Sequence, residues 1–582
     1  MDENKLGYVV LEVGGIQKYI LSSGKLKEMI GGSELIESLA SDYLDDYAEK
    51  HDYKLLTKDE IRQPKDREIL PLQRNAGTLH LLCSSYAIAH DFLKDFALGI
   101  IDKFPGLPLF GALETCDFTS NSLRDAKFKL NRKIGKQRNL VPVAAGLDLL
   151  PICEVAPLDG KACVYLKNNP YKAEENISLA SQTRRNEFLL EKARKRLRRI
   201  ESAEFLNDEL VWSDNLDDLV GDKEKLAFIH IDGNDLGMLF RKRLESGNQE
   251  HSDNENNGEQ NEELGSNKSH KCVQNNIKKM LDLSDLVKNT TTYAFKKALT
   301  DALRYAHLPK GATVQARPLV LGGDDVTVII RADLALIFID SFVKAFERYS
   351  RDNNQGEGLS VGVGMVVCAK SYPFLKAFAL AEELLKSAKN ATLEINAPVV
   401  TDKSTHKGKK NEQTAPLKRS RASSLDYLVI TNDVDTDIDS IKEQHFKAQD
   451  HALLTKKPII LKNNNLANFV ASAIDVLERL PRSYTRNALN DCKIGVSASK
   501  NSYSKLLDNL KRNLGGRHNQ KLMSAEEFLA LFPENYGFFL KDKDDRFYTK
   551  LGDYLELGHL LSSHSQDYLE YFSNQERSCA DK

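Results

Sequence analysis

Two short segments about 90 positions apart each place carboxylates where an apolar run stops. Phe228–Ile231 has the character of a buried strand, and it ends at Asp232 before a helical pattern begins. Gly322–Asp325, with the sequence Gly-Gly-Asp-Asp, breaks a second apolar run and returns it as a third. The pattern predicts a strand end beside a hairpin, both rich in carboxylates.

Carboxylates arranged in this way are suited to metal chemistry. Hard divalent cations prefer oxygen ligands, and two such ions roughly 3.5–4 Å apart support in-line phosphoryl transfer. Glycines permit a tight hairpin and let a phosphate approach the backbone. Asp232, Asp324 and Asp325 are therefore candidate ligands of two Mg²⁺ or Mn²⁺ ions, as in the palms of polymerases and nucleotide cyclases. Gly and Asp are also favoured turn residues, but the third, upstream carboxylate favours a metal site.

The chain contains this unit twice. Pro71–Leu82 aligns without gaps with Pro318–Ile329, and Val9–Gly15 aligns with Ala227–Gly233. In each copy the order is strand, helix, strand, hairpin, strand, helix, strand, which is the ferredoxin-like pattern.

The first copy lacks the carboxylates in this alignment. Gly14 takes the place of Asp232, and Gly77 and Thr78 take the places of the hairpin aspartates. One active palm beside one silent palm explains the difference, because the silent copy can form the other wall of a nucleotide cleft. We therefore expect Asn75–Gly77 to lie opposite the active hairpin.

Length and pattern together predict an α+β protein with two ferredoxin-like palms and a mainly helical C-terminal domain. The 582 residues are enough for three or four domains. We expect a first palm over 1–150, a basic helical connector over 151–222, a second palm over 223–430 and a helical domain over 431–582. Polar, low-complexity segments at 248–276 and 401–424 are predicted to be insertions in the second palm, the first of them a disordered surface loop.

Composition is that of a soluble cytoplasmic protein. Hydrophobic residues make up 41% and charged residues 29%. Eight cysteines are scattered singly, which suits a reducing compartment. No apolar run is long enough to cross a bilayer, and the N-terminus has no signal region. We expect no membrane partner.

A net charge of −2 gives no global attraction to nucleic acid, so RNA binding would have to be local. Arg184–Arg199 is an amphipathic, very basic helical pattern, and Lys403–Arg421 is a basic insertion. Each could contact RNA, but such basic runs are more often a solvated surface.

Three further features bear on nucleotide binding. Lys386 and Lys389 are three residues apart on one helix face, where they could grip a triphosphate or lie exposed. Asn234 and Asp235 follow Asp232 and could read a base or ribose, or simply begin a helix. No histidine cluster of a His-Asp nuclease and no GxxxxGK[ST] phosphate loop occurs in the sequence.

These motifs resemble a known family. HIDGNDLG and LGGDDVTVI, preceded by GGIQKYI and GGSELI, are similar to segments of the large polymerase-like subunit of type III CRISPR effector complexes. The resemblance is strongest over 223–395, fair over 1–116 and vague after 430. It implies two palms, of which the second joins ATP into cyclic oligoadenylate.

The resemblance also implies roles for individual residues. Asp232, Asp324 and Asp325 would hold the metal ions, while Gly322 and Gly323 would lie along the phosphates. The list of nucleotide-binding residues is completed by Gly233, Asn234, Lys386 and Lys389. The sequence lacks the N-terminal His-Asp nuclease domain of fuller family members, which puts DNA cleavage in doubt.

We therefore expect a metal-dependent nucleotidyltransferase that makes a cyclic or linear oligonucleotide from ATP. Its expected partners are ATP, guide or target RNA and other subunits of an effector complex. Two alternatives stay open at this point: a diguanylate cyclase that uses GTP, and a non-catalytic RNA-binding scaffold.

Overall fold

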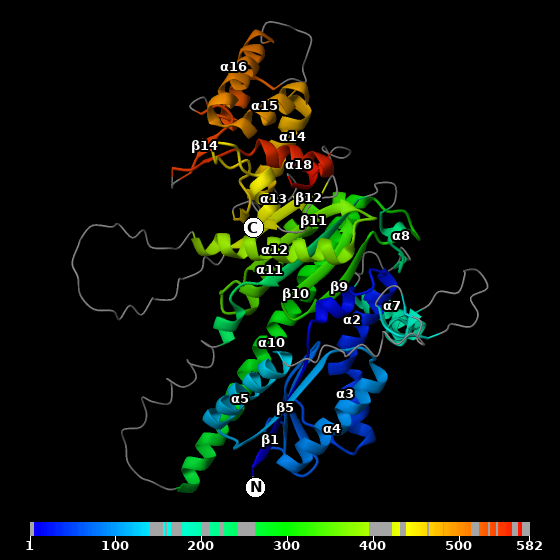
Figure 1. The fold of residues 1–582 in the computed structure, drawn as a ribbon. Coiled ribbons are helices and arrows are strands. Elements are labelled where there is room, and N and C mark those ends of the chain that lie inside the picture. Colours follow the sequence, from blue (N-terminus) through cyan, green and yellow to red (C-terminus); the bar gives the residue numbers. More distant parts are fainter. Residues whose placement is uncertain are drawn as a thin grey trace.

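The structure is a computed structural model, and it places two mixed sheets one above the other with a helical domain at the far end (Figure 1). The first palm lies at one end, the second palm lies in the middle, and helices α14 to α17 lie beyond it. The structure describes residues 5–139, 155–156, 160–164, 177–200, 210–220, 225–240, 262–394, 422–430, 438–462, 465–480, 482–513, 523–533, 536–542, 545–561 and 568–572.

The first palm is a five-stranded sheet in the order β2-β3-β4-β1-β5. Alternate β1 side chains face opposite ways, so that one face packs on α4 and the other on α5. The strands are β1 (Leu6–Val13), β2 (Lys54–Leu55), β3 (Glu68–Asn75), β4 (Thr78–Cys83) and β5 (Leu109–Cys116). The helices are α1 (Ile16–Leu21), α2 (Leu26–Ala40), α3 (Asp42–Lys50), α4 (Tyr86–Lys103) and α5 (Ser120–Asn139).

The second palm repeats this plan in a six-stranded sheet, β13-β12-β11-β8-β10-β9. Its strands are β8 (Lys225–Gly233), β9 (Ala316–Gly322), β10 (Asp325–Arg331), β11 (Val361–Ala369), β12 (Ser423–Val429) and β13 (Ile459–Leu461). Its main helices are α10 (Glu262–Ala306), α11 (Ala335–Asn353) and α12 (Phe374–Glu394), and a 3-10 turn, η3 (Ala332–Leu334), precedes α11.

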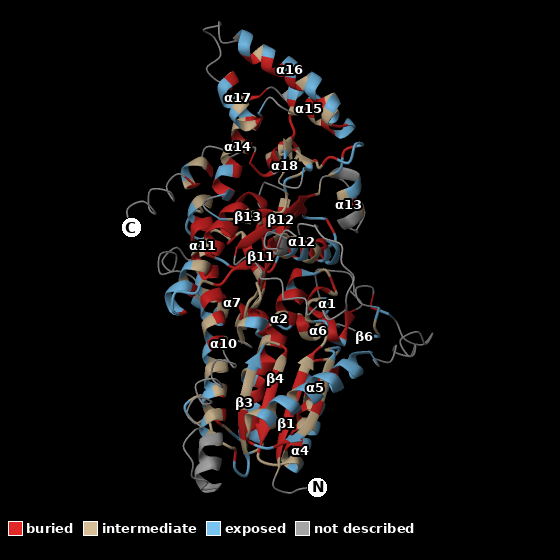
Figure 2. Cartoon of the chain, turned by 90° about the vertical axis from the view of Figure 1, so that its left-hand side faces the viewer, coloured by how far each residue is buried: buried red, intermediate tan, exposed pale blue. Residues whose placement is uncertain are grey.

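Both sheets therefore have the ferredoxin-like strand order, and the predicted fold class is confirmed. The four shared strands are ordered β3-β4-β1-β5 in one sheet and β9-β10-β8-β11 in the other. The buried strands of both sheets run through the centre of the molecule, with the exposed helix faces outside (Figure 2).

The connector holds β6 (Cys163–Val164), β7 (Ile177–Ser178), α6 (Leu179–Arg184), α7 (Glu187–Ile200) and α8 (Leu216–Val220). The basic run expected as one helix over Arg184–Arg199 is divided between α6 and α7. The chain between α6 and α7 packs directly on α2 at Gly31. Only glycine permits this contact, because a Cβ at Gly31 would lie 1.8 Å from the Arg184 carbonyl oxygen.

The expected loop over 248–276 is wrong in its second half. Residues 262–276 belong to α10, and the side chains of Val273 and Ile277 are buried against the first palm. Polar composition suggested a loop, but contact with another domain stabilises a helix here. Likewise Ser423 and Ser424 of the expected insertion 401–424 belong to β12, while residues 401–421 lie outside the described part.

Helices of each palm pack against the other palm. The N-terminal half of α10 lies on α5 and β3 of the first palm, and its C-terminal half joins the core of the second. In the other direction, α2 contacts β9 and α1 contacts α12. The helices that follow the first strand of each palm therefore contact the other palm. These reciprocal contacts give the two palms an approximate twofold arrangement.

The C-terminal region is mainly helical, although its β13 joins the sheet of the second palm. Tyr427 of β12 donates a hydrogen bond to the Asp553 carbonyl at 3.2 Å, which ties the region to the palm. In the described residues no helix is long and apolar enough to span a bilayer. The elements are α13 (Ile438–His445), α14 (Asn465–Arg479), α15 (Arg482–Ile494), α16 (Val496–Asn513), α17 (Ala525–Leu531), β14 (Leu540–Lys541), β15 (Phe547–Tyr548) and α18 (Leu551–Leu561).

Candidate active site at the hairpin of the second palm

Strand register brings the three predicted carboxylates together. β8 and β10 are antiparallel neighbours with Ile231 opposite Val326, so Asp232 and Asp325 are the next pair in register. Asp324 stands at the turn, with its Cβ 3.1 Å from the point where a Gly233 side chain would begin. The cluster lies on the face of the sheet that α12 covers.

Asp324 is the member of the cluster whose ionisation is opposed by its surroundings. Burial raises the pKa of Asp324 to about 7, and the neighbouring charge of Asp232 adds to this effect. Two carboxylates this close cannot both ionise readily without a cation between them. The site therefore favours a shared positive charge.

Lys389 supplies part of that charge. Its Nζ donates to Oδ2 of Asp232 at 2.5 Å and to the Gly233 carbonyl at 2.9 Å. Gly362 makes this approach possible, because a Cβ there would lie 2.7 Å from Cγ of Lys389. Lys386 is not brought to the carboxylates: it is 65% exposed and pairs with Glu382.

The sequence reasoning missed His230. Its Nε2 lies 2.8 Å from Oδ1 of Asp325, and its ring packs on Phe378 of α12 at 5.2 Å. Because side chains alternate along a strand, a residue two positions before Asp232 must lie on the same face. That period-2 relation is the signal that could have identified it.

Asn234 turns the chain away from β8. Its backbone N–H donates to the Ser360 carbonyl at 2.8 Å, and its Nδ2 donates to Ser360 Oγ at 3.1 Å. Its Oδ1 is buried, with no hydrogen-bond partner among the described residues. Asp235 has a positive φ of 56° and accepts the N–H groups of Met238 and Leu239, so it begins the short helix at 236–240.

The hairpin of the first palm faces this site, as predicted. The Cβ of Ala76 lies 3.8 Å from the point where a side chain at Gly322 would begin. Gly323 has a φ of +60° and has no atom within 4 Å of its would-be Cβ, so the tip of the active hairpin is open. The two hairpins therefore meet tip to tip, and Gly322 and Gly323 stay partly exposed.

Register corrects the expected correspondence of Gly14 with Asp232. On β1, Glu12 lies opposite Thr78 and Phe110. These two are the counterparts of Asp325 and Gly362, the cross-strand neighbours of Asp232. Glu12 is therefore the structural equivalent of Asp232, and the alignment by sequence was displaced by two residues, a shift that keeps the same face.

The correspondence extends to the covering helix. Arg138 on α5 donates to Oε2 of Glu12 at 2.8 Å, as Lys389 on α12 does to Asp232. The first palm thus keeps one carboxylate and its cation. It lacks the two carboxylates of the hairpin, and Val10 takes the place of His230.

The chemistry of the donor set fits a divalent cation. Asp232, Asp324 and Asp325 offer only oxygen ligands at adjoining strand ends, and the unpartnered Oδ1 of Asn234 is close to them along the chain. In the arrangement seen here, no three acidic, His or Cys side chains of the described residues converge tightly enough to hold an ion. Lys389 occupies one of the two carboxylate oxygens of Asp232, Oδ2.

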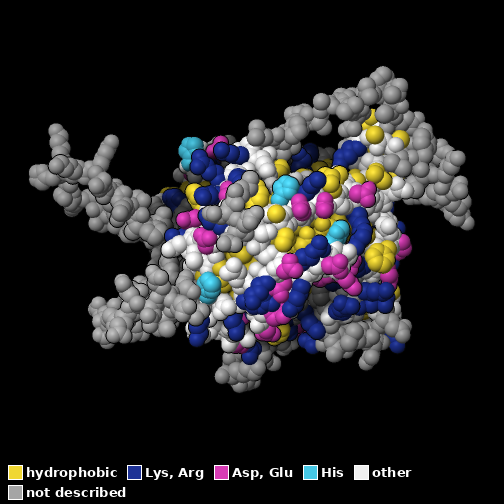
Figure 3. Space-filling model, turned by 90° about the horizontal axis from the view of Figure 1, so that it is seen from below, with side chains coloured by type: hydrophobic (Ala, Val, Ile, Leu, Met, Phe, Trp, Pro, Cys, Tyr) yellow, Lys and Arg dark blue, Asp and Glu magenta, His cyan; other side chains and the backbone are white. Residues whose placement is uncertain are grey.

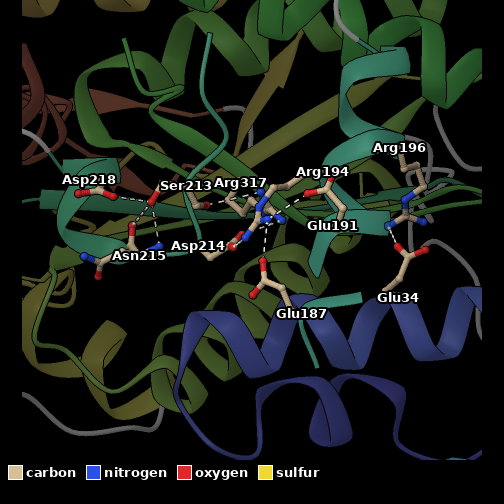
Figure 4. Close-up of polar contacts among 10 residues, drawn as sticks. All are labelled: Glu34, Glu187, Glu191, Arg194, Arg196, Ser213, Asp214, Asn215, Asp218 and Arg317. Atoms are coloured by element: carbon tan, nitrogen blue, oxygen red, sulfur yellow. Dashed lines mark hydrogen bonds and ion pairs between the residues drawn. The ribbon is translucent and has the colours of Figure 1, made fainter. Parts of the chain in front are cut away.

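Part of the basic helix α7 forms ion pairs at the junction of the palms (Figure 4). Arg194 donates to Glu187 at 2.9 Å and contacts Asp214, and Asp214 is 3.4 Å from Arg317 of β9. Burial lowers the pKa of Arg317 to about 10. This part of the predicted RNA surface therefore has a structural role.

Among the described residues, the end of the molecule formed by the first palm carries side chains of both charges. Lys and Arg side chains lie beside Asp and Glu side chains there, with hydrophobic ones between them (Figure 3). The second basic segment, Lys403–Arg421, lies outside the described residues.

Residues 225–394 match the model of the Cas10/Cmr2 second palm domain. The resemblance predicted from sequence is confirmed by this match. Among curated proteins, nothing matches.

Several solved structures are similar at low identity. The apo Csm1-Csm4 cassette matches with 12% identity and a TM-score of 0.39, covering 67% of this chain and 53% of that one. The Csm1-Csm4 cassette with cA4 matches with 11% identity and a TM-score of 0.46, covering 97% and 70%. Csm1 of T. onnurineus matches with 13% identity and a TM-score of 0.37, covering 67% and 52%. The chain spans about half the length of the first of these.

Proposed function

We propose that the second palm, whose residues 225–394 match the model of the Cas10/Cmr2 second palm domain, is a metal-dependent nucleotidyltransferase that joins ATP into an oligoadenylate signal, linear or cyclic. The observation that carries the proposal is that Asp232, at the end of β8, adjoins Asp324 and Asp325 of the open Gly-Gly-Asp-Asp hairpin, which meets the hairpin of the first palm.

Divalent cations, held by these three carboxylates, would acidify an attacking ribose hydroxyl and stabilise departing pyrophosphate. The chain's own groups do the rest. His230 orients Asp325 through a 2.8 Å contact. Lys389 places an ammonium where a triphosphate would lie, and the open tip at Gly323 leaves room for phosphates.

The first palm binds the second nucleotide in this proposal. Its hairpin lies against the active one, so a second ATP held there would be close to the first, which raises the effective concentration of the reacting groups. We further propose that the chain works within an effector complex with other subunits and RNA.

The experiment is incubation of the purified chain, alone and with co-purified subunits, with labelled ATP or GTP and Mg²⁺ or Mn²⁺. We expect oligoadenylate from ATP, and a loss of about 100-fold or more in Asp232→Asn and Asp325→Asn. Glu382→Gln is the matched control, because Glu382 lies on α12 and, among the described residues, its ion pair is with exposed Lys386. Consumption of GTP alone would instead establish the diguanylate alternative.

One observation favours a non-catalytic scaffold as the second candidate. Lys389 already neutralises Asp232, so the cluster can exist without a metal ion. If neither nucleotide is consumed under any of these conditions while RNA is bound, the scaffold function replaces the nucleotidyltransferase.

A further inference from the structure

A pocket of about 520 Å³ lies within the first palm, away from the hairpins. Its floor is the sheet face formed by β1, β3 and β4, and its walls are α5 and the N-terminal half of α10. α5 and α10 lie side by side over this face (Figure 1). Its size is within the range of small-molecule sites.

The lining combines apolar walls with positive charge. Leu72, Val273, Ile277 and Met280 are among the apolar residues, and the aromatic ring of Phe128 is 71% exposed. The charged residues of the lining are two cations, Arg124 and Lys127, and no carboxylate is among them.

Lys127 is the cation that lies deepest. Burial lowers the pKa of Lys127, and no opposing charge from a described residue offsets this effect. A half-buried ammonium without a counter-ion is costly, and an anion in the pocket would relieve that cost.

A buried hydrogen-bonded pair adds a donor. Tyr8 Oη lies 3.0 Å from Nδ1 of His80, and both side chains are buried. Burial lowers the pKa of His80 to about 3, so its imidazole is neutral. When Tyr8 donates to Nδ1, the imidazole proton must be on Nε2, which is then available to donate.

The second palm shows that this space is not required by the fold. Arg138 and Lys389 each pair with the equivalent carboxylate of their sheet, and Lys127 and Phe378 lie eleven residues before them on the covering helices α5 and α12. There Phe378 packs on His230 and Phe374 packs on Phe228, which fills the equivalent space with aromatic rings. The first palm has a lysine and a pocket where the second has a packed core.

We propose that this pocket binds a small organic anion with an apolar body, whose charged group meets Lys127 and His80 Nε2 and whose body contacts the walls of α5 and α10. The wall formed by α10 connects the pocket to the second palm, because α10 continues into the core of that palm. A bound ligand therefore contacts an element that both palms share.

The test uses 8-anilinonaphthalene-1-sulfonate, an aromatic body with one sulfonate, titrated by fluorescence into the full chain without nucleotide. N-phenyl-1-naphthylamine, which lacks the sulfonate, is the neutral probe. We expect saturable binding of one sulfonate probe per chain. We expect binding of the neutral probe to be about tenfold weaker or more, because the charged hydrogen bonds are lost.

Lys127→Met should reduce affinity for the sulfonate probe by about tenfold and leave the neutral probe unaffected. Lys127→Arg should restore most of the sulfonate affinity. The matched control is Lys129→Met, an exposed lysine of the same helix that does not line the pocket. Hydrogen exchange should show probe-dependent protection in α5 and in residues 270–281 of wild type.

Equal affinity for the two probes, an unchanged affinity in Lys127→Met, or protection confined to other segments would overturn the proposal. None of these measurements involves ATP turnover. The pocket and the proposed nucleotidyltransferase activity can therefore fail separately.

Discussion

Glu12 occupies in the first sheet the position that Asp232 occupies in the second. Both face a helix on the same side of the sheet, and both accept a hydrogen bond from a cation of that helix. The two palms therefore differ at the hairpin rather than at the strand end. A single carboxylate without hairpin partners is a poor ligand set for a divalent ion.

We therefore predict that Glu12→Gln leaves the metal dependence of ATP turnover unchanged. The Mn²⁺ concentration for half-maximal activity should stay within about twofold of wild type, whereas Asp232→Asn should abolish activity, since only Asp232 has neighbouring hairpin carboxylates. A shifted metal dependence in Glu12→Gln would mean that the first palm holds an ion of its own.

Restoring both hairpin aspartates by Gly77→Asp and Thr78→Asp should not create a second active centre. The reason is the turn, not a missing upstream carboxylate. Gly77 has a φ of +75°, whereas in the active hairpin the positive φ of +60° is at Gly323, one position earlier. A Cβ at Gly77 would also lie 2.5 Å from Ile16 Cδ1.

The measurement is turnover in the background of Asp325→Asn, where the second palm is inactive. We expect no recovery, together with a lower melting temperature caused by the strained residue. Thr78→Asp alone avoids the strain and serves as the control. Recovered ATP turnover in the double aspartate variant would contradict the argument from turn geometry.

Bulk at the meeting point of the hairpins should slow turnover. Ala76→Trp adds an indole to a Cβ that lies 3.8 Å from the point where a side chain at Gly322 would begin, without changing a position of positive φ. We expect turnover to fall by about tenfold or more, because a displacement of about 1 Å at a reacting centre can cost that much. Ala76→Ser, which adds one oxygen, is the control. Unimpaired turnover in Ala76→Trp would show that the two hairpins do not share a nucleotide cleft.

Asp324 should make both stability and metal binding depend on pH. The folded chain ionises Asp324 at a pKa of about 7, and an unfolded chain ionises it near about 4. Between these values the folded state holds more protons, so stability falls as pH rises from about 4 to 7 and then levels. Metal ions need the ionised form, so metal affinity should rise over the same range.

Melting curves of wild type and Asp324→Asn between pH 4.5 and 8 test the first expectation, because the asparagine variant should lose this component of the pH dependence. Mn²⁺ titrations at the same pH values test the second. Parallel melting profiles of the two proteins would show that Asp324 ionises normally in the folded chain.

Several elements were predictable because local patterns determine them. Alternating apolar residues located β8 and the strands around the hairpin, and glycines marked the turns. The helix over 262–276 was not predictable, because its buried side chains contact a domain more than 100 residues away in sequence. The alignment of β1 with β8 was not predictable from sequence either. Glu12 and Gly14 lie on the same face of the strand, and only the strand pairing shows which of them corresponds to Asp232.

Charge was the least predictable property of the site. Lys386 and Lys389 look alike in sequence, but the absence of a side chain at Gly362 lets only Lys389 reach Asp232. The basic run in α7 likewise gave no sign that acidic residues of α2 and of the segment before α8 would pair with it.

Two triple variants of α7 separate RNA binding from stability. Lys192, Arg194 and Arg196 pair with acidic residues of neighbouring elements, whereas Lys195 and the Arg198–Arg199 pair are exposed. Alanine at the three paired positions should lower the melting temperature by several degrees, because losing a partner of nearly buried Asp214 can cost about 3–5 kcal/mol. Alanine at the three exposed positions should leave the melting temperature unchanged.

If α7 contacts RNA, the exposed triple variant should weaken binding of single-stranded RNA and flatten its salt dependence, because fewer counter-ions are released. Fluorescence anisotropy at several salt concentrations measures both quantities. The paired variant, assayed well below its melting temperature, should keep the salt slope of wild type, since its charges are already neutralised within the protein. An unchanged slope in the exposed variant would exclude α7 from the RNA surface, and any RNA affinity of the chain would have to come from another segment.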